Sequence, residues 1–251
     1  MTIESPPSLL KVLLQTEAMR HVNCRTVRME PGAHLALTEE LPACAHMLLS
    51  GVASTAVAMA DGSRALVRTS RRGDLLEMQY LLGGITGQHL VSVIMAGEAV
   101  RIPFRAVQQA FATDIRFRNA VLASAAAQFL ATERLVACNL FHEVEERLAS
   151  YLLTLQNATG FNVLPLTQEL LSEELGVQRT TVVQAAGELR RKGCVNFSRG
   201  RIEVVDRDRL IKAACECYAG PSRDREQAPP ESESPVHDRA EPSLAASSFA
   251  A

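Results

Sequence analysis

The sequence predicts an α+β fold in which an antiparallel, jelly-roll-like β-roll precedes a long helix and a small C-terminal unit of helices and strands. Three observations predict it. Short apolar stretches alternate with turns from about residue 21 to Pro103. Apolar residues then recur at spacings of three and four between Leu122 and Asn139. Two short helical patterns follow, separated by Gly176 and succeeded by a strand–turn–strand pattern. Period two indicates strands and period 3.6 indicates helices.

Length and composition place the chain among soluble globular proteins. Its 251 residues are enough for two domains, and 47% apolar and 22% charged residues are ordinary proportions. No run of 18 apolar residues occurs, and no basic residue precedes the short apolar run near the N-terminus. We therefore expect no transmembrane helix and no signal peptide, and a cytoplasmic location. The six cysteines are scattered, which favours reduced thiols over a disulfide framework.

Residues 8–103 are expected to form the roll, beginning with a short helix over residues 8–18. That helix should turn Leu9, Leu10, Leu13 and Leu14 inward. Asp61–Gly62 is the strongest hairpin signal in this region, because both residue types tolerate the positive φ that a tight turn needs. The expected strand segments are Thr26–Met29, His46–Leu49, Val52–Met59, Ala65–Thr69, Leu81–Leu82, His89–Met95 and Ala99–Ile102.

Residues 104–141 are expected to hold a short helix, Arg105–Phe111, and a long helix from about Asp114 to Asn139. The long helix carries a repeat of the kind found where two helices pair side by side. Its members are Leu122, Ala125, Phe129, Thr132, Val136 and Asn139. Pairing with a second copy of the chain is the favoured interpretation, and packing against the protein's own roll is the alternative.

Residues 142–219 are expected to contain two short helices joined by a tight turn, after an amphipathic helix at His142–Gln156. Thr167 is a good N-cap for the first short helix, and Gly176 ends it. Gln178 is expected to cap the second short helix. The expected buried faces consist of Leu170, Leu171 and Leu175 in the first helix and Val182, Val183, Ala186 and Leu189 in the second. Two short helices in this arrangement are typical of a helix-turn-helix.

The second short helix presents polar side chains that can reach the edges of DNA bases in a major groove. Arg179, Thr180 and Gln184 are expected on its outward face. A strand–turn–strand pattern follows, with Arg199 and Arg201 at its tip, where a wing contacts phosphate. Between Arg179 and Lys212, nine basic residues oppose four acidic ones, a local net charge of +5 in a chain whose net charge is −2. The expected DNA-binding residues are Thr167, Gln178, Arg179, Thr180, Thr181, Gln184, Arg199 and Arg201.

The remaining C-terminal sequence is expected to form a last helix, Arg207–Tyr218, and a disordered tail over residues 220–251. Enzymatic activity is not expected, because no Walker loop, nucleophile elbow or zinc-protease motif occurs. Glu145–Glu146 and Glu173–Glu174 are interpreted as solvated helix faces. Neither a metal nor a cofactor is expected. Cys215–Glu216–Cys217 supplies only two of the four ligands of a thiolate metal site, although Cys138 and His142 could contribute.

The order of roll, long helix and winged helix-turn-helix resembles the Crp–Fnr superfamily of bacterial transcription regulators. The resemblance covers about residues 15 to 218. It is most specific at Val144–Ala149, at Leu166–Gly176 and at Arg179–Val182. It implies a sequence-specific, homodimeric DNA-binding protein of the cytoplasm that binds a near-palindromic operator in double-stranded DNA. RNA polymerase and a small effector are further partners that the resemblance suggests. The alternative from another class is a small-ligand-binding or protein-docking module whose winged helix does not bind DNA.

The sensor half departs from the cyclic-nucleotide-binding pattern of the superfamily. The family's Gly-Glu pair is Gly73–Asp74 here, and the segment that usually supplies an arginine for the cyclic phosphate contains none. Cyclic AMP is therefore not the expected ligand, because a buried phosphate needs a cation or a cradle of donors. The candidate effector pocket implied by the resemblance consists of Gly73, Asp74, Glu77, Gln88, His89 and Thr132. In the recognition helix, Arg179 matches the family's first base-reading arginine, whereas Thr180 and Gln184 replace the usual glutamate and arginine.

Overall fold

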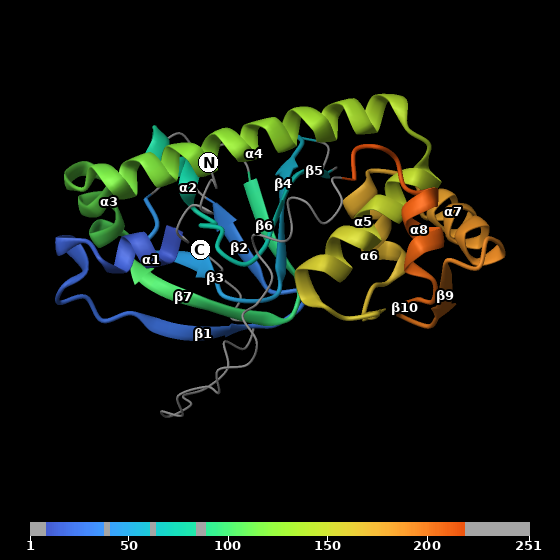
Figure 1. The fold of residues 1–251 in the computed structure, drawn as a ribbon, viewed down its shortest axis with the longest axis horizontal. Coiled ribbons are helices and arrows are strands. Elements are labelled where there is room, and N and C mark those ends of the chain that lie inside the picture. Colours follow the sequence, from blue (N-terminus) through green and yellow to red (C-terminus); the bar gives the residue numbers. More distant parts are fainter. Residues whose placement is uncertain (1–8, 38–40, 61–63, 84–88, 219–251) are drawn as a thin grey trace, which may run out of the picture.

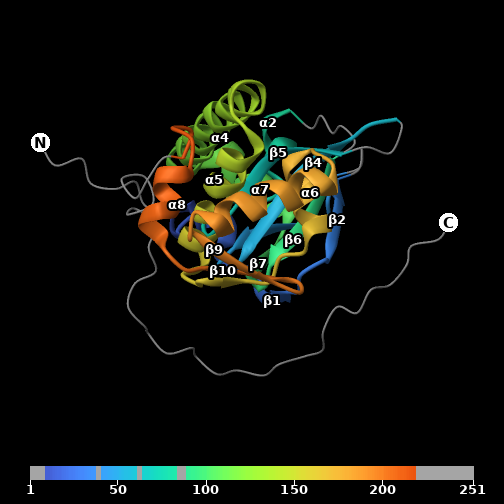
Figure 2. The same cartoon turned by 90° about the vertical axis from the view of Figure 1, so that its right-hand side faces the viewer.

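A computed structural model describes residues 9–37, 41–60, 64–83 and 89–218. The long helix α4 (Ile115–Phe141) runs along the whole molecule, over the β-roll at one end and toward the C-terminal helices at the other (Figure 1). Viewed along its length, the molecule presents the C-terminal helices and the small β-hairpin at one end (Figure 2). This order confirms the predicted fold class: antiparallel roll, long helix, winged helix-turn-helix.

The roll consists of two antiparallel sheets. One has the strand order β2-β6-β4-β5, and the other has the order β1-β7-β3. The strands are β1 (Arg25–Met29), β2 (His34–Leu37), β3 (Cys44–Leu48), β4 (Val52–Ala58), β5 (Arg64–Ser70), β6 (His89–Met95) and β7 (Gly97–Pro103). The sequence pattern missed β2. Strands β4 and β5 pair from Ala53↔Ser70 to Ala58↔Arg64, as a hairpin requires. The expected Asp61–Gly62 turn itself lies outside the described residues.

The expected strand at Leu81–Leu82 is wrong, because this segment belongs to helix α2 (Met78–Leu82). Two apolar residues before paired glycines cannot distinguish a strand end from a helix end. The helix is favoured because it buries Met78 and Tyr80 together. The Tyr80 ring meets the Phe104 ring edge to face, with their centroids 5.9 Å apart.

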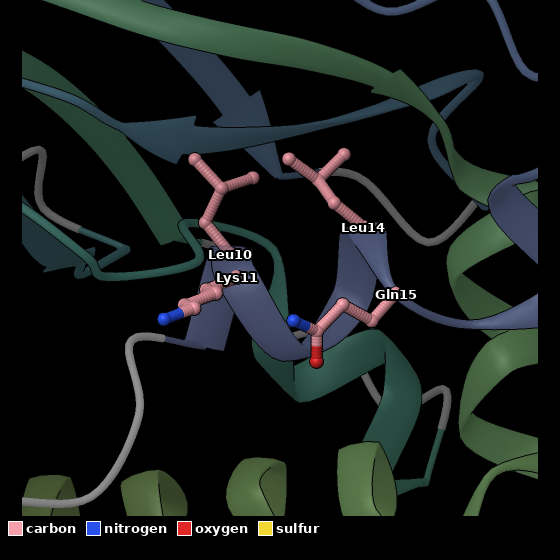
Figure 3. Close-up of a pocket in the computed structure, with 4 residues that line it drawn as sticks. All are labelled: Leu10, Lys11, Leu14 and Gln15. Carbon is pink, nitrogen blue, oxygen red and sulfur yellow. The ribbon is translucent and has the colours of Figure 1, made fainter.

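Helix α1 (Leu9–Leu14) is shorter than expected and only part of the predicted inward face is buried. Leu9 and Leu13 join the core, whereas Leu14 is 51% exposed and Leu10 is half-buried. A helix of six residues has one narrow buried stripe, and Val12 takes the remaining place on it. Leu10 and Leu14 instead line an open hollow together with Lys11 and Gln15 (Figure 3).

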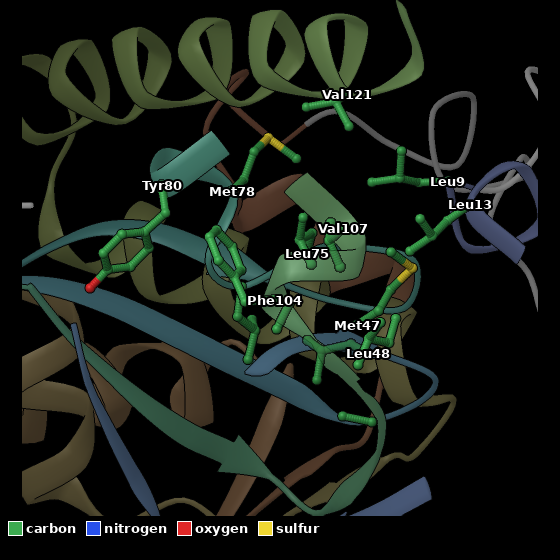
Figure 4. Packing of buried hydrophobic residues seen from close by; sticks show 14 of the residues in the cluster. Leu9, Leu13, Met47, Leu48, Leu75, Met78, Tyr80, Phe104, Val107 and Val121 are labelled. Atoms are coloured by element: carbon green, nitrogen blue, oxygen red, sulfur yellow. The ribbon is translucent and has the colours of Figure 1, made fainter. Parts of the chain in front are cut away.

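The core of the roll is assembled from segments that are distant in the sequence. Leu9 and Leu13 meet Met47 of β3, Leu75 before α2 and Val107 of α3 (Phe104–Thr113) (Figure 4). Phe104, Phe117 and Val121 complete the contact with the helices. A short 3-10 helix, η1 (Glu17–Met19), adds Met19. The roll therefore holds the first half of α4 firmly in place.

Helix α4 begins where the sequence predicted, because the carboxylate of Asp114 accepts hydrogen bonds from the backbone nitrogens of Arg116 and Phe117. Its outer face is apolar and exposed. Exposed side chains lie at Leu122, Phe129, Leu130, Val136, Leu140 and Phe141. By length and composition alone, α4 could cross a membrane, and 11% of its most apolar stretch is buried. An exposed apolar row of this kind requires a cover.

Of the predicted seam residues, Leu122, Phe129, Val136 and Asn139 are exposed, whereas Ala125 and Thr132 are half-buried. The Thr132 hydroxyl donates to the backbone oxygen of Val67 in β5, at 3.2 Å. Thr132 therefore faces the roll. Because an α-helix has 3.6 residues per turn, several rows of alternating three and four spacing coexist on it. The exposed row instead alternates Leu122, Phe129 and Val136 with Ala126, Glu133 and Leu140.

The C-terminal unit has its own core. It contains α5 (Val144–Thr159), β8 (Val163–Leu164), α6 (Gln168–Leu175), α7 (Arg179–Arg191), β9 (Val195–Ser198), β10 (Arg201–Val204) and α8 (Arg207–Ala213). The strands form one sheet of order β8-β10-β9. Three residues of the roll, Val52, Ile94 and Met95, pack into the same core. The C-terminal unit is thus seated directly on the roll.

The last helix is shorter than the predicted Arg207–Tyr218. Helix α8 ends at Ala213, because Ala214 adopts an extended conformation. The following residues bend back instead of continuing the helix. Cys215 is buried beside the end of α4, where its sulfur lies 3.6 Å from that of Cys138.

Two glycines of opposite environment give a test of this packing. A Cβ at Gly97 would lie 2.2 Å from the backbone oxygen of Ser50, whereas a Cβ at Gly187, in the middle of α7, would meet nothing within 4 Å. We expect Gly97→Ala to lower the free energy of unfolding by about 1–3 kcal/mol through overpacking. Gly187→Ala should raise it by about 0.5–1 kcal/mol through helix propensity. Urea denaturation of both variants checks the signs, and a neutral Gly97→Ala would contradict the register at Gly97.

Candidate nucleic-acid interface

The turn between α6 and α7 forms for the local reasons that the sequence indicated. The Thr167 hydroxyl accepts a hydrogen bond from the Leu170 backbone nitrogen at 3.1 Å, which confirms it as the N-cap of α6. Gly176 ends the helix with φ +63°, a conformation that favours glycine. Gln178 occupies the N-cap position of α7, as predicted, but its side chain makes no capping hydrogen bond. Asparagine is a good capping residue, but the side chain of glutamine is one methylene longer, which places its amide less well for this hydrogen bond.

Helix α7 divides into a buried and an exposed side. Its buried face consists of Val182, Ala185, Ala186 and Leu189. Val183, expected in that face, is instead 44% exposed, because it lies about 100° around the helix from Val182. Arg179, Thr180 and Gln184 are exposed, and Thr181 is half-buried. Helix α7 lies at the end of the molecule that faces the viewer in Figure 2. The predicted base-reading residues are therefore accessible in a single protomer.

The wing follows α7 and brings two more arginines to the surface. Strands β9 and β10 pair antiparallel from Val204↔Val195 to Arg201↔Ser198. Gly200, with φ +70°, makes the turn between them. Arg199 and Arg201 are both exposed at this turn. The hairpin that follows α7 thus carries two exposed guanidinium groups.

Acidic side chains neutralise some of the basic residues of this unit but not those at its outer end. Lys192 pairs with Glu145 at 2.5 Å, Arg209 pairs with Asp206 at 3.1 Å, and Arg191 pairs with Glu188. Arg207 is turned inward, where it donates to Asn157 at 2.6 Å and to the Tyr218 hydroxyl at 3.0 Å. Within the described part of the chain, no ion pair is formed by Arg179, Arg190, Arg199, Arg201 or Lys212.

Arg179 is positioned by a neighbouring side chain. Its Nε and Nη2 atoms both lie 3.4 Å from the Oε1 atom of Gln168, in the first turn of α6. These are long, exposed hydrogen bonds, so they orient the guanidinium without committing its donors. The group remains free to make the bidentate contact that a guanine base offers.

The C-terminal unit is tied to the roll by a buried carboxylate that sequence reasoning placed on a solvated helix face. Glu174 of α6 is 8% exposed. Its carboxylate accepts hydrogen bonds from the Ser54 hydroxyl of β4 at 2.8 Å and from the Tyr151 hydroxyl of α5 at 2.9 Å. Helix periodicity could not reveal this contact, because the partner Ser54 lies 120 residues earlier in the chain. Glu174 therefore joins the first helix of the helix-turn-helix to the roll.

Burial shifts the ionisation of this pair. Desolvation raises the pKa of Glu174, although the hydrogen bonds from Ser54 and Tyr151 oppose that rise. Desolvation and the nearby Glu174 carboxylate also raise the pKa of Tyr151. The hydrogen bonds thus compensate only part of the free-energy cost of keeping a carboxylate in this contact.

The predicted effector residues are only partly brought together. Gln88 lies outside the described residues, and Thr132 faces β5 from α4. Gly73 takes φ +89° in a turn. The Glu77 carboxylate is engaged by His46, whose backbone nitrogen and Nδ1 atom lie 2.7 and 2.6 Å from it. The Nδ1 atom of His89 is buried and has no hydrogen-bond partner among the described residues.

Sequence reasoning missed a half-buried cation in the roll, Arg68 of β5. Its guanidinium donates to Gln128 of α4 at 2.9 Å, to Thr55 at 3.2 Å and to the backbone oxygen of Leu76 at 2.9 Å. Burial lowers the pKa of Arg68, whereas the Asp74 and Glu77 carboxylates raise it. A lone arginine in an alternating strand pattern gives no signal, because exposed positions of strands commonly carry arginine. Arg68 connects the roll to the long helix.

Comparisons with known proteins agree with this arrangement. Residues 146–213 match the Crp-like helix-turn-helix domain. No curated relative matches the sequence of the chain. Among solved structures, FixK2 of Bradyrhizobium japonicum is similar with a TM-score of 0.63 and 16% identity, over 77% of this chain and 98% of FixK2.

Two further structures show the same likeness. A CRP/FNR family transcriptional regulator of Thermus thermophilus has a TM-score of 0.62 at 18% identity, over 76% of this chain and 98% of that protein. The c-di-GMP-responsive regulator CLP of Xanthomonas campestris has a TM-score of 0.61 at 16% identity, over 79% and 98% of the two chains. At such identities the likeness shows the fold, and the fold is that of Crp/Fnr regulators.

The buried Glu174 gives a test of how the two units are joined. A folded-state pKa above the unfolded one means that the group stabilises the fold at acid pH and loses this contribution as pH rises through the folded pKa. We expect the unfolding free energy of the natural protein to decline, relative to Glu174→Gln, as pH rises from about 4 to about 8. Denaturant titrations across that range measure it. Glu169→Gln, at an exposed position of the same helix outside this contact, is the control and should follow the natural protein. A constant difference between Glu174→Gln and the natural protein would contradict the assignment.

Proposed function

We propose that this chain, with its Crp-like helix-turn-helix domain and the fold of Crp/Fnr regulators, is a homodimeric transcription regulator of the cytoplasm. In this proposal, each protomer places α7 in the major groove of one half of a near-palindromic operator. The observation that carries it is the polar, exposed side of α7, where Arg179, Thr180 and Gln184 stand free of the core. The domain limits we propose are 8–103 for the sensor, 104–141 for the connecting helices and 142–219 for the DNA-binding unit.

The side chains of α7 suggest which bases are read. An arginine can donate both its terminal groups to the two acceptors of guanine, and a glutamine can pair with adenine in the same way. We assign these roles to Arg179 and Gln184. Thr180 suits a thymine methyl group or a phosphate. This set differs from the arginine–glutamate–arginine set of the resembling family, so a different half-site is expected.

Phosphate contacts would orient the unit on the duplex. Arg199 and Arg201 form no ion pair within the described residues, and they lie on the hairpin next to α7. Thr167, Gln178 and Thr181 surround the start of the recognition helix and offer neutral hydrogen-bonding groups. Contacts of this kind fix orientation but carry no sequence information.

The exposed apolar row of α4 supports pairing of two protomers. Phe129 is 66% exposed, Leu140 is 72% exposed and Val136 is 55% exposed. A second copy of α4 packed side by side would bury this row, and the pair would carry two recognition helices. Large apolar side chains lined up on one helix face are typical of an interaction surface. A membrane would cover the row equally well, and a protomer count in solution separates the two explanations.

The sensor role follows from the links between the roll and the helices. An effector acts on DNA binding only if its affinity differs between two arrangements of the units. Two polar contacts are placed to respond: Ser54–Glu174 joins the roll to α6, and Arg68–Gln128 joins it to α4. We propose that a small effector, where one acts, works through these contacts.

Selection from a random duplex pool, followed by Arg179→Ala, tests the reading role. We expect the natural protein to select one two-part sequence. Arg179→Ala should lose preference at a single base pair of each half-site, a loss of about 1–3 kcal/mol of discrimination there. Competition binding with duplexes substituted at that pair measures this. A selectivity left intact by Arg179→Ala would remove Arg179 from the reading role.

Two control variants accompany this experiment. Arg199→Ala should weaken binding to selected and random duplexes by the same factor, because a phosphate contact is blind to sequence. Arg20→Ala, at an exposed ion pair with Glu17 far from α7, should change neither property. If the natural protein binds no duplex at low ionic strength, the result would contradict DNA binding and favour a protein-docking role for the winged helix.

Replacement of the exposed row tests the dimer. Phe129→Glu places a charge at the centre of the proposed interface, and we expect the protein to sediment as a folded monomer. Ala127→Glu, exposed on another side of α4, is the matched control and should leave the dimer intact. Sedimentation equilibrium and circular dichroism measure mass and folding together. A natural protein that is monomeric at operator-binding concentrations would contradict the dimer proposal.

A further inference from the structure

Four side chains with metal-ligand chemistry meet where the long helix ends. Cys138 lies in the last turn of α4, His142 is the residue at which that helix ends, and Cys215 and Cys217 follow α8. One ligand atom from each of the four lies within 4.8 Å of the other three. Residues separated by more than 70 positions in the sequence have thus been brought into one cluster.

Two of the six distances between the ligand atoms have the lengths of edges in a tetrahedral site, and all six lie within 4.8 Å. The sulfurs of Cys138 and Cys215 are 3.6 Å apart, and the Cys217 sulfur is 3.6 Å from the Nδ1 atom of His142. With metal–sulfur bonds of about 2.3 Å and metal–nitrogen bonds of about 2.0–2.1 Å, a tetrahedron has sulfur–sulfur edges of roughly 3.8 Å and sulfur–nitrogen edges of roughly 3.6 Å. A cation at the centre would therefore need only small movements of the side chains.

The surroundings of the cluster resemble those of a zinc site. The Nε2 atom of His142 lies 3.1 Å from the Glu216 carboxylate, which leaves Nδ1 facing the cysteines. A carboxylate on the far nitrogen of a ligand histidine fixes the ring and makes it a better donor. The Ser150 hydroxyl lies 3.1 Å from the Cys215 sulfur, where it can donate to a thiolate.

Two of the four side chains are buried and two are half-buried, so an ion could enter the cluster from the solvent side. Cys138 and Cys215 are 7% and 5% exposed, and both approach from the protein side. His142 and Cys217 are half-buried and lie nearer the solvent. This arrangement shields the centre while leaving a route for a hydrated cation.

We propose that Cys138, His142, Cys215 and Cys217 bind a thiolate-preferring divalent cation of the zinc type in a tetrahedral site. Binding deprotonates the three thiols, so three protons are released for each cation bound, and no electron is transferred. The sequence predicted no metal, although Cys138 and His142 were named as residues that could add to the Cys215–Cys217 pair. The bend of the chain after Ala213 brings Cys215 and Cys217 next to Cys138 and His142.

The place of the site in the fold gives it a consequence. Cys138 and His142 stand where α4 gives way to α5, and Cys215 and Cys217 end the described part of the C-terminal unit. A bound cation would cross-link these two points and reduce their relative movement. Metal binding at this site does not require DNA binding, because the metal content of the protein can be measured in the absence of DNA.

Cobalt titration of the reduced full chain tests the site directly. The probe is Co²⁺, added to protein freed of metal with a chelator and kept without oxygen. We expect one Co²⁺ per chain, with cobalt–thiolate charge-transfer bands and the visible bands of tetrahedral cobalt. One equivalent of Zn²⁺ should then abolish the bands, because zinc binds such ligands more tightly. Zn²⁺ should also raise the melting temperature.

Variants assign the ligands. Cys217→Ser, at a half-buried position, should lose the spectrum and the rise in melting temperature while circular dichroism shows an intact fold. Cys24→Ser, a half-buried cysteine outside the cluster, is the matched control and should keep both. A reduced natural protein that gives no cobalt spectrum would overturn the proposal, as would an unchanged spectrum in Cys217→Ser. A Cys138–Cys215 disulfide formed in air, without cobalt binding by the reduced protein, would also overturn it and indicate a redox pair.

Discussion

Burial of one side of α7 keeps its other side in solvent. Val182, Ala186 and Leu189 pack into the C-terminal core, so rotation of the helix would expose three apolar side chains. At roughly 1.5–3 kcal/mol for each large apolar side chain, that cost exceeds the free energy of any single exposed polar contact. Arg179 and Gln184 therefore project outward with a fixed geometry. The hairpin that carries Arg199 and Arg201 rests on the same core, and the whole candidate DNA surface moves as one piece.

The long helix α4 is the second determinant of function, because it has two different apolar faces. Phe117 and Val121 fasten it to the roll, and Phe129 with Leu140 leaves the opposite face open. A helix held on one side can transmit a change in the roll to whatever covers its other side. The Glu174 contact gives the roll a separate connection to the helix-turn-helix. Under the proposed function, these two connections would let a change in the roll reach the helix-turn-helix.

The parts of the fold that depend on near neighbours were predictable from the sequence. Thr167 begins helix α6 and Gly176 ends it as expected, since capping uses residues within four positions. Parts that depend on distant neighbours were not. Glu174 looked solvated because its partner Ser54 is on a strand of the roll, and Thr132 looked like a seam residue because periodicity gives a helix several apolar rows. The cluster around Cys138 needed the reversal after α8, which an extended Ala214 makes and no sequence signal announced.

The central claim is that the end of the molecule formed by α7 and the wing lies on duplex DNA. The salt dependence of binding to the selected duplex tests it most directly, because each phosphate neutralised adds about −0.9 to the slope of log K against log salt. The two arginines per protomer that are assigned to phosphate, Arg199 and Arg201, predict a slope of roughly −4 for two protomers on one duplex. A slope near zero, or binding of a single protomer per duplex, would contradict the account.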